Sequence, residues 1–257
     1  MLFVWYKVSF DEKWSHGSAV CETVYFFVEF VCVFPWKCVS LNNQNREKIM
    51  DGILRKLPIG IQTFEKLREG DYLYVDKTAL VWRIASTETP YFLSRPRRFG
   101  KSLLLSTFEA YFEGKKELFE GLAIADMEKE WKTYPVFHLD LNAEKYDSPQ
   151  ALVEILSRQL TQWELKYGKG EDEETLSGRF AGVIRRASEQ ADRGVVVLVD
   201  EYDKPLLQAL DDGALLDDYR KTLKAFYGVL KSSDRYLRFV FLTGVTKFAQ
   251  VSVFSDL

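Results

Sequence analysis

Histidine and cysteine are scarce in this sequence of 257 residues. The chain contains two histidines, so a metal site built from several histidines is excluded. The three cysteines are confined to the first fifth of the chain, and their spacing fits neither a CxxC zinc pair nor a disulfide framework; they are Cys21, Cys32 and Cys38. This cysteine usage favours a reducing, cytoplasmic compartment.

Long apolar runs and a surplus of either charge are also missing. The longest apolar stretch, residues 24–36, is too short to cross a bilayer and contains Glu29 in its middle. It also lacks the basic start and the small-residue cleavage site of a signal peptide, so no membrane segment is predicted. Lysine and arginine total 35 against 38 aspartate and glutamate. The net charge of −3 argues against a general nucleic-acid-binding surface, although not against a local basic groove.

The composition is typical of one large folded domain, or of one domain with an appendage. Hydrophobic residues make up 47% of the chain and charged residues 28%, which excludes a disordered or collagen-like protein. Residues 1–49 differ from the rest because they are rich in Phe, Trp, Val and Cys and follow no helical period. We therefore expect an atypical N-terminal extension at 1–49, explained by a mis-assigned start before Met50, and a functional domain at 50–257. The alternative is a small β-rich element that packs on that domain.

From Met50 onward, short apolar strands alternate with amphipathic helices, which is the pattern of an α/β fold. The apolar runs predict strands at 72–75, 91–94, 135–141, 195–199 and 239–243. The helical periodicity predicts helices near 78–86, 102–112, 174–191 and 219–231, and one that opens at Ser148-Pro149. The β-branched run at 195–199 is typical of a strand buried on both faces of a parallel sheet.

The segment 91–112, YFLSRPRRFGKSLLLSTFEAYF, combines a strand, a basic loop and a helix that begins directly after a Gly-Lys-Ser triplet. The backbone N–H groups and the dipole at such a helix start attract phosphate. Lys101 is placed to reach the β- and γ-phosphates, and the Ser102 hydroxyl is placed to ligate Mg²⁺. The predicted nucleotide-binding residues are Arg97, Arg98, Phe99, Gly100, Lys101, Ser102 and Leu103.

This loop departs from the full phosphate-loop signature, GxxxxGKS, at one position, because Arg95 stands where that signature has glycine. The alternative interpretation is therefore an exposed basic turn that precedes a helix. A further hypothesis is a nucleic-acid contact through the basic side chains of this region, which are Arg95, Arg97 and Arg98, with Lys115 and Lys116 nearby.

A second stretch, VVVLVDEYD at 195–203, favours the phosphate-site interpretation, because an apolar strand that ends in two carboxylates follows the loop by about 100 residues. Asp200 is predicted to hold the metal ion, through water or through Ser102, and Glu201 to polarise the attacking water. The alternative is that Asp200 caps the next helix while Glu201 is solvated. The later strand ends at Thr243, a predicted γ-phosphate sensor with Thr246 and Lys247 nearby, or else an ordinary strand exit. The predicted catalytic residues are Lys101, Glu201 and Thr243.

Four segments in this order, at 57–78, 91–112, 195–206 and 238–248, closely resemble the bacterial AAA-ATPase-like family. RPRRFGKS is the usual form of the loop in that family, so Arg95 does not by itself indicate inactivity. The resemblance implies a P-loop NTPase three-layer sandwich with a mostly parallel sheet in the order 5-1-4-3-2. It also implies that strand 5 and a nuclease domain would follow Leu257, so that the domain is incomplete at its C-terminus.

These observations predict an ATP-binding module that hydrolyses ATP with Mg²⁺ and drives or regulates a partner domain. The alternative is a nucleotide-dependent interaction or regulatory module that does not hydrolyse ATP. The expected partners are the nucleotide and a nuclease domain or partner protein, with nucleic acid and a second copy of the chain left open.

Overall fold

The computed structural model describes residues 55–87, 89–142 and 145–246. The expected extension at residues 1–49 lies outside these described residues, and so does the sensor candidate Lys247. The region after Thr246, where an incomplete C-terminus was expected, also lies outside them. The fold and the site below therefore concern the phosphate-loop segment and the strands that follow it.

Four parallel strands form the sheet, in the order β1-β4-β3-β2. They are β1 (Tyr91–Ser94), β2 (Val136–Asp140), β3 (Val195–Asp200) and β4 (Leu237–Gly244). All six residues of β3 are buried, as expected for a β-branched strand with neighbours on both sides and helices on both faces. The α/β fold with a parallel sheet is thus confirmed.

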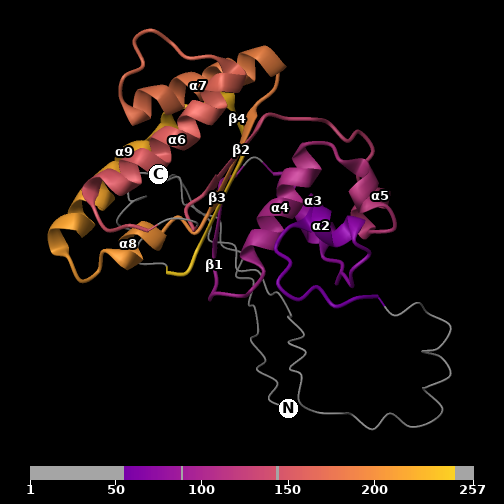
Figure 1. Cartoon of the computed structure of the whole chain (residues 1–257). Helices are drawn as coiled ribbons and strands as arrows, with labels where there is room; N and C mark the ends of the chain where they lie inside the picture. Colours follow the sequence, from indigo (N-terminus) through magenta and orange to yellow (C-terminus); the bar gives the residue numbers. More distant parts are fainter. Residues whose placement is uncertain (1–54, 88, 143–144, 247–257) are drawn as a thin grey trace, which may run out of the picture.

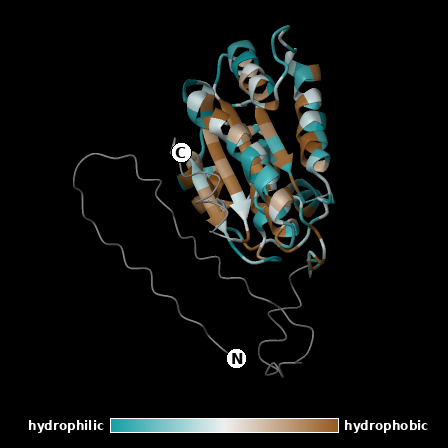
Figure 2. Cartoon of the chain, turned by 90° about the vertical axis from the view of Figure 1, so that its left-hand side faces the viewer, coloured by the Kyte–Doolittle hydropathy of each residue, from teal (hydrophilic) through white to brown (hydrophobic). Residues whose placement is uncertain are grey.

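Helices cover both faces of this sheet (Figure 1). One face carries α2 (Phe64–Glu69), α3 (Thr78–Ala85), α4 (Lys101–Phe112), η1 (Lys116–Phe119) and α5 (Ala123–Met127). The other face carries α6 (Pro149–Tyr167), α7 (Leu176–Ala191), α8 (Lys204–Gln208) and α9 (Gly213–Ser232), and η2 (Asp234–Tyr236) leads into β4. The strands are mostly hydrophobic along their length, whereas the covering helices mix hydrophobic and hydrophilic positions (Figure 2). This distribution buries one side of each helix and leaves the other in water.

Two sequence-based expectations about local structure need correction. Residues 72–75 form no strand; only an isolated bridge joins Tyr72 to Lys56. The run is apolar, but two of its side chains face solvent, with Leu73 45% and Val75 58% exposed. The helix expected at 219–231 begins earlier, at Gly213, because Asp212 caps it by accepting a hydrogen bond from the Leu215 amide.

At the start of α6, Ser148 occupies the cap position, but its side chain makes no capping hydrogen bond. Pro149 lies in the first turn, as expected from its fixed φ and missing N–H. In the described part of the chain, no helix is long and apolar enough to cross a membrane.

Candidate functional site

The loop between β1 and α4 changes direction through left-handed backbone at Arg98 (φ 66°) and Gly100 (φ 73°). The Leu104 amide donates to the Gly100 carbonyl at 2.9 Å, which starts the hydrogen-bond ladder of α4. The amides of Lys101, Ser102 and Leu103 therefore lack an intrahelical acceptor and point toward the loop. No side chain caps this start. The arrangement leaves three N–H donors and the positive end of the helix dipole for an anion.

The predicted nucleotide-binding residues form this one loop and the first turn of α4. Arg97, Arg98 and Phe99 are exposed at the outside of the loop, and Phe99 retains 43% of its accessible surface. Ser102 and Leu103 are half-buried in the first helical turn.

The Lys101 ammonium lies beneath the loop. The residue is only 4% exposed, and its Nζ donates to the carbonyls of Arg95 at 3.1 Å and Pro96 at 3.3 Å. The same nitrogen lies 3.2 Å from Glu201 Oε1. The structure thus joins two predicted site residues that are far apart in sequence, one at the start of α4 and the other directly after β3.

A buried threonine connects the acidic end of β3 to the end of β4. Thr243 Oγ1 donates to Asp200 Oδ1 and accepts a hydrogen bond from the Glu201 amide at 3.3 Å. Thr243 is fully buried and Asp200 is 3% exposed. The alternative that Asp200 caps α8 does not match these contacts, because Asp203 occupies the cap position of α8 and the Asp200 side chain accepts a hydrogen bond from Thr243 of β4. Glu201 has a left-handed backbone (φ 53°). This conformation is costly for a residue other than glycine, and such residues are concentrated at functional sites.

Asp203 lies beside the candidate site, and the sequence analysis did not single it out. It is fully buried, and its carboxylate accepts hydrogen bonds from the amides of Val245 and Thr246 and from the Thr246 hydroxyl. The bond from the Thr246 hydroxyl means that Thr246 helps to hold the loop that leaves β4. The sequence did contain a signal for this role, because Asp203 is the third carboxylate of the segment DEYD. A carboxylate that is buried after a core strand needs hydrogen-bond donors around it.

The loop after β4 also passes close to β3. At Gly244, an added Cβ would lie 2.3 Å from a ring carbon of Tyr202, so only glycine allows this approach. The Arg95 amide donates to the Gly244 carbonyl at 3.1 Å, and Ser94 Oγ donates to the Val245 carbonyl at 3.0 Å. The exits of β1, β3 and β4 are therefore held together by hydrogen bonds.

A histidine and a glutamate pair beside this region. His138 Nδ1 lies 2.9 Å from Glu109 Oε2, joining β2 to α4. Burial opposes the charged imidazole, but the hydrogen bond with Glu109 and the charges of Glu109, Asp200 and Asp140 outweigh it, so the pKa of His138 is raised. Asp140 is the register partner of Asp200, which places two carboxylate residues side by side at the carboxyl ends of β2 and β3.

The oxygen-rich donor set suits Mg²⁺ better than a transition metal. Among the residues that the structure describes, no cluster of three His, Cys, Asp or Glu side chains could hold an ion alone. Mg²⁺ commonly uses one or two protein oxygens together with water and substrate phosphates. The Ser102 hydroxyl and the Asp200 carboxylate fit that mode of binding.

The fold and this cluster of strand-exit residues define an α/β protein with a polar site at the carboxyl edge of a parallel sheet. Residues 58–254 match the family described as "Predicted AAA-ATPase" (AAA-ATPase_like), and the chain belongs to this AAA-ATPase-like family. It is also 43% identical over 204 residues to an "Uncharacterized protein in vnfD 5'region" of Azotobacter chroococcum mcd 1. That alignment covers 79% of this chain and 40% of the relative. No solved structure matches the chain.

Proposed function

We propose that this chain is an ATP-binding P-loop module that hydrolyses ATP with Mg²⁺. The observation that carries the proposal is the buried contact between Lys101 Nζ and Glu201 Oε1 at 3.2 Å. It brings a phosphate-binding cation and a candidate base for water to the same end of the sheet. Phosphoryl transfer requires these two groups close together, and membership of the AAA-ATPase-like family supports ATP as the nucleotide.

In the proposed binding mode, the free amides at the start of α4 and the Lys101 ammonium receive the β- and γ-phosphates. Phosphate oxygens are charged acceptors, so they bind Lys101 more strongly than the neutral carbonyls of Arg95 and Pro96 do. Ser102 and Asp200 would hold Mg²⁺, which supplies neutralisation of the phosphate charge when it is bound.

The transfer of Lys101 from Glu201 to the phosphates links binding to chemistry. Once Lys101 contacts phosphate, the Glu201 carboxylate loses its cation and can orient and polarise the attacking water. Thr243 is proposed to fix both acidic residues, because its hydroxyl bonds to the Asp200 side chain and to the Glu201 amide. Thr243 would thus act on a γ-phosphate indirectly, by fixing the positions of Asp200 and Glu201.

The wider setting is also a proposal. The order β1-β4-β3-β2 agrees with four of the five strands of a 5-1-4-3-2 P-loop NTPase sandwich. We propose residues 50–257 as this ATPase domain, located in the cytoplasm, with ATP hydrolysis that drives or regulates a nuclease domain or another partner protein. This chain spans 40% of the matching relative, so that relative is long enough to contain further domains.

Release of radiolabelled γ-phosphate by the full chain tests the proposal. Turnover that requires Mg²⁺ and disappears in Glu201→Gln would support hydrolysis. Tight ATP binding without turnover in the parent chain would instead support the non-hydrolysing interaction module. Absence of ATP binding would reject both functions.

A further inference from the structure

Strand β2 lies at one edge of the sheet, and β3 is its only strand neighbour among the residues that the structure describes. The Val196 amide donates to the Pro135 carbonyl at 2.8 Å, and the Leu141 amide donates to the Asp200 carbonyl at 3.2 Å. In a parallel ladder, alternate residues bond to the same neighbour. The backbone groups of Val136, His138 and Asp140 therefore face away from β3, toward the open edge.

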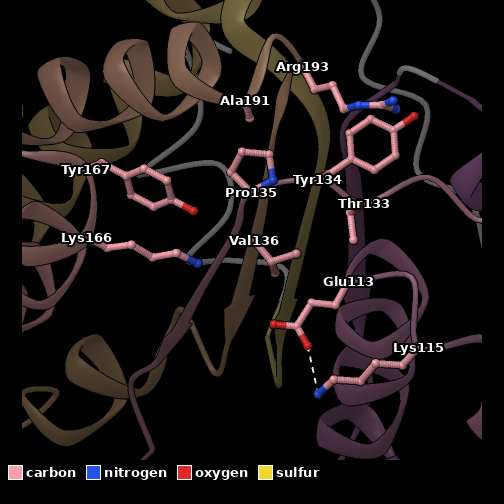
Figure 3. Close-up of a pocket in the computed structure, with 10 residues that line it drawn as sticks. All are labelled: Glu113, Lys115, Thr133, Tyr134, Pro135, Val136, Lys166, Tyr167, Ala191 and Arg193. Carbon is pink, nitrogen blue, oxygen red and sulfur yellow. Dashed lines mark ion pairs between the residues drawn. The ribbon is translucent and has the colours of Figure 1, made fainter.

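A groove lies along the amino half of this edge (Figure 3). Lys166 and Tyr167, at the end of α6, lie on one side of Val136, and Glu113 and Lys115, just after α4, lie on the other side. The two helical layers thus separate at this point and leave the start of β2 between them. The groove is at the opposite end of the strands from the phosphate loop.

The charge of this groove is mainly positive. Lys166 Nζ lies 5.1 Å from the ring centre of Tyr167, and the Arg193 guanidinium lies 5.6 Å from that of Tyr134. Within the described ranges, neither Lys166 nor Arg193 forms an ion pair. Lys115 also lines the groove, but it is paired with Glu113 at 2.9 Å, so that side is close to neutral.

We propose that an extended acidic peptide segment of a partner protein binds in this groove and adds a strand to the free edge of β2. The outward backbone groups would supply hydrogen bonds at strand spacing, as in other cases of strand addition. Lys166 and Arg193 would pair with acidic side chains at the amino end of β2. Asp140 and Glu109 lie farther along, so acidic residues of the peptide should be confined to the part near Lys166 and Arg193.

The backbone evidence favours a peptide over nucleic acid. Cations alone would attract either ligand, but the alternating N–H and C=O groups of an open strand edge match another strand and not a phosphate backbone. A second copy of this chain could also use an edge, but the surplus of positive charge in the groove would repel the same groove of a second copy.

Fluorescence anisotropy with the full chain and the labelled peptides Glu-Val-Glu-Val-Thr-Val-Thr and Thr-Val-Thr-Val-Glu-Val-Glu, whose glutamates are confined to one end, tests the proposal. We expect saturable binding that is lost when every peptide amide is N-methylated or when lysine replaces every glutamate. The double variant Lys166→Glu with Arg193→Glu should weaken binding roughly tenfold or more. Lys221→Glu, an exposed change on α9, is the matched control and should bind as the parent does.

A second variant separates the backbone contact from charge. Val136→Pro removes one outward N–H while leaving the bonds between β2 and β3 in place, and it should weaken peptide binding, with an unchanged circular dichroism spectrum as the check of folding. An equally tight complex in both groove variants would overturn the proposal, as would no peptide binding by the parent. Binding of an oligo-dT strand in place of the peptide, or a dimer that Val136→Pro dissociates, would also overturn it.

Discussion

Two ion pairs of similar burial lie on opposite faces of the sheet: Lys101–Glu201 at the phosphate loop and Arg179–Glu164 between α7 and α6. The side chains are 4% and 10% exposed in the first pair and 10% and 6% exposed in the second. Arg179 Nε and Nη2 each donate to a Glu164 oxygen at 2.8 Å. Arg179 also donates to Ser157 Oγ at 2.7 Å and to Thr161 Oγ1 at 2.9 Å.

Lys101 is bound through longer contacts than Arg179. It makes one contact with Glu201 at 3.2 Å and bonds to two loop carbonyls at 3.1 and 3.3 Å, and Glu201 has a left-handed backbone. An arginine fork that uses its donors on fixed partners holds two helices together, whereas an ammonium with long bonds can exchange them for phosphate. Similar burial therefore does not imply a similar role. The number and length of the hydrogen bonds made by each cation distinguish the structural pair from the pair at the proposed site.

The largest expected effect follows from breaking the structural pair. Arg179→Met leaves the buried Glu164 carboxylate without its cation and should lower the free energy of unfolding by about 3–5 kcal/mol. Urea denaturation followed by circular dichroism measures this change. The double variant Arg179→Met with Glu164→Leu should recover most of the stability, because it leaves no unpaired charge. A loss below about 1 kcal/mol in the single variant would show that the two pairs do not differ as described.

Glu201→Gln should separate ATP binding from turnover. Removal of the carboxylate should reduce hydrolysis by about 100-fold or more, the contribution of a positioned base. ATP affinity should be unchanged or higher, because Lys101 loses a competing partner. Affinity and turnover should be measured on one preparation with Mg²⁺ and with EDTA, using the exposed Glu189→Gln as the control. Unchanged values would indicate a solvated residue, and a joint loss of both would indicate a metal ligand.

Lys101→Ala should weaken ATP binding by about tenfold to a hundredfold. The change removes a charge-assisted contact worth roughly 1.5–3 kcal/mol. Titration with fluorescent ATP measures the loss, and Lys115→Ala, just beyond the far end of α4, provides a control that also removes a paired lysine. If both variants bind ATP as tightly as the parent, Lys101 is not a phosphate ligand.

Much of the fold could be predicted from sequence because the four strands are short apolar runs with turn residues at their ends. The run at 72–75 had the same pattern but found no neighbouring strand, so periodicity alone was insufficient there. The short helix α5 was not predicted because its start depends on distant residues. Asp76 Oδ2 accepts from the Ala123 amide at 2.7 Å, and Thr78 Oγ1 accepts from the Ile124 amide at 3.1 Å.

The candidate site was predictable in its residue types but not in its connections. Lys101, Asp200 and Glu201 stand out because a phosphate loop and an acidic strand end have recognisable patterns. The bond from Thr243 to Asp200 and the hold of Asp203 on the loop after β4 depend on which strand exits become neighbours. The family resemblance implied the sheet order that makes these exits neighbours, but no local pattern contains the individual side-chain contacts between them.

A third ion pair, Arg186–Glu173, extends the comparison because its contribution to stability should depend on pH. Arg186 Nη2 donates to Glu173 Oε2 at 2.8 Å, and the side chains are 16% and 14% exposed. The hydrogen bond with Arg186 lowers the pKa of Glu173 despite the opposing effect of burial. A lowered pKa in the folded state means that the stabilisation is complete above the pKa of the unfolded state. It is lost as the pH falls through the pKa of the folded state.

Glu173→Gln should therefore lower the free energy of unfolding by about 0.5–1.5 kcal/mol near neutral pH, and this loss should shrink below about pH 4. Urea titrations across this range measure it, with the exposed Glu171→Gln as control; a cost that stays constant with pH would show that the charge of Glu173 contributes nothing.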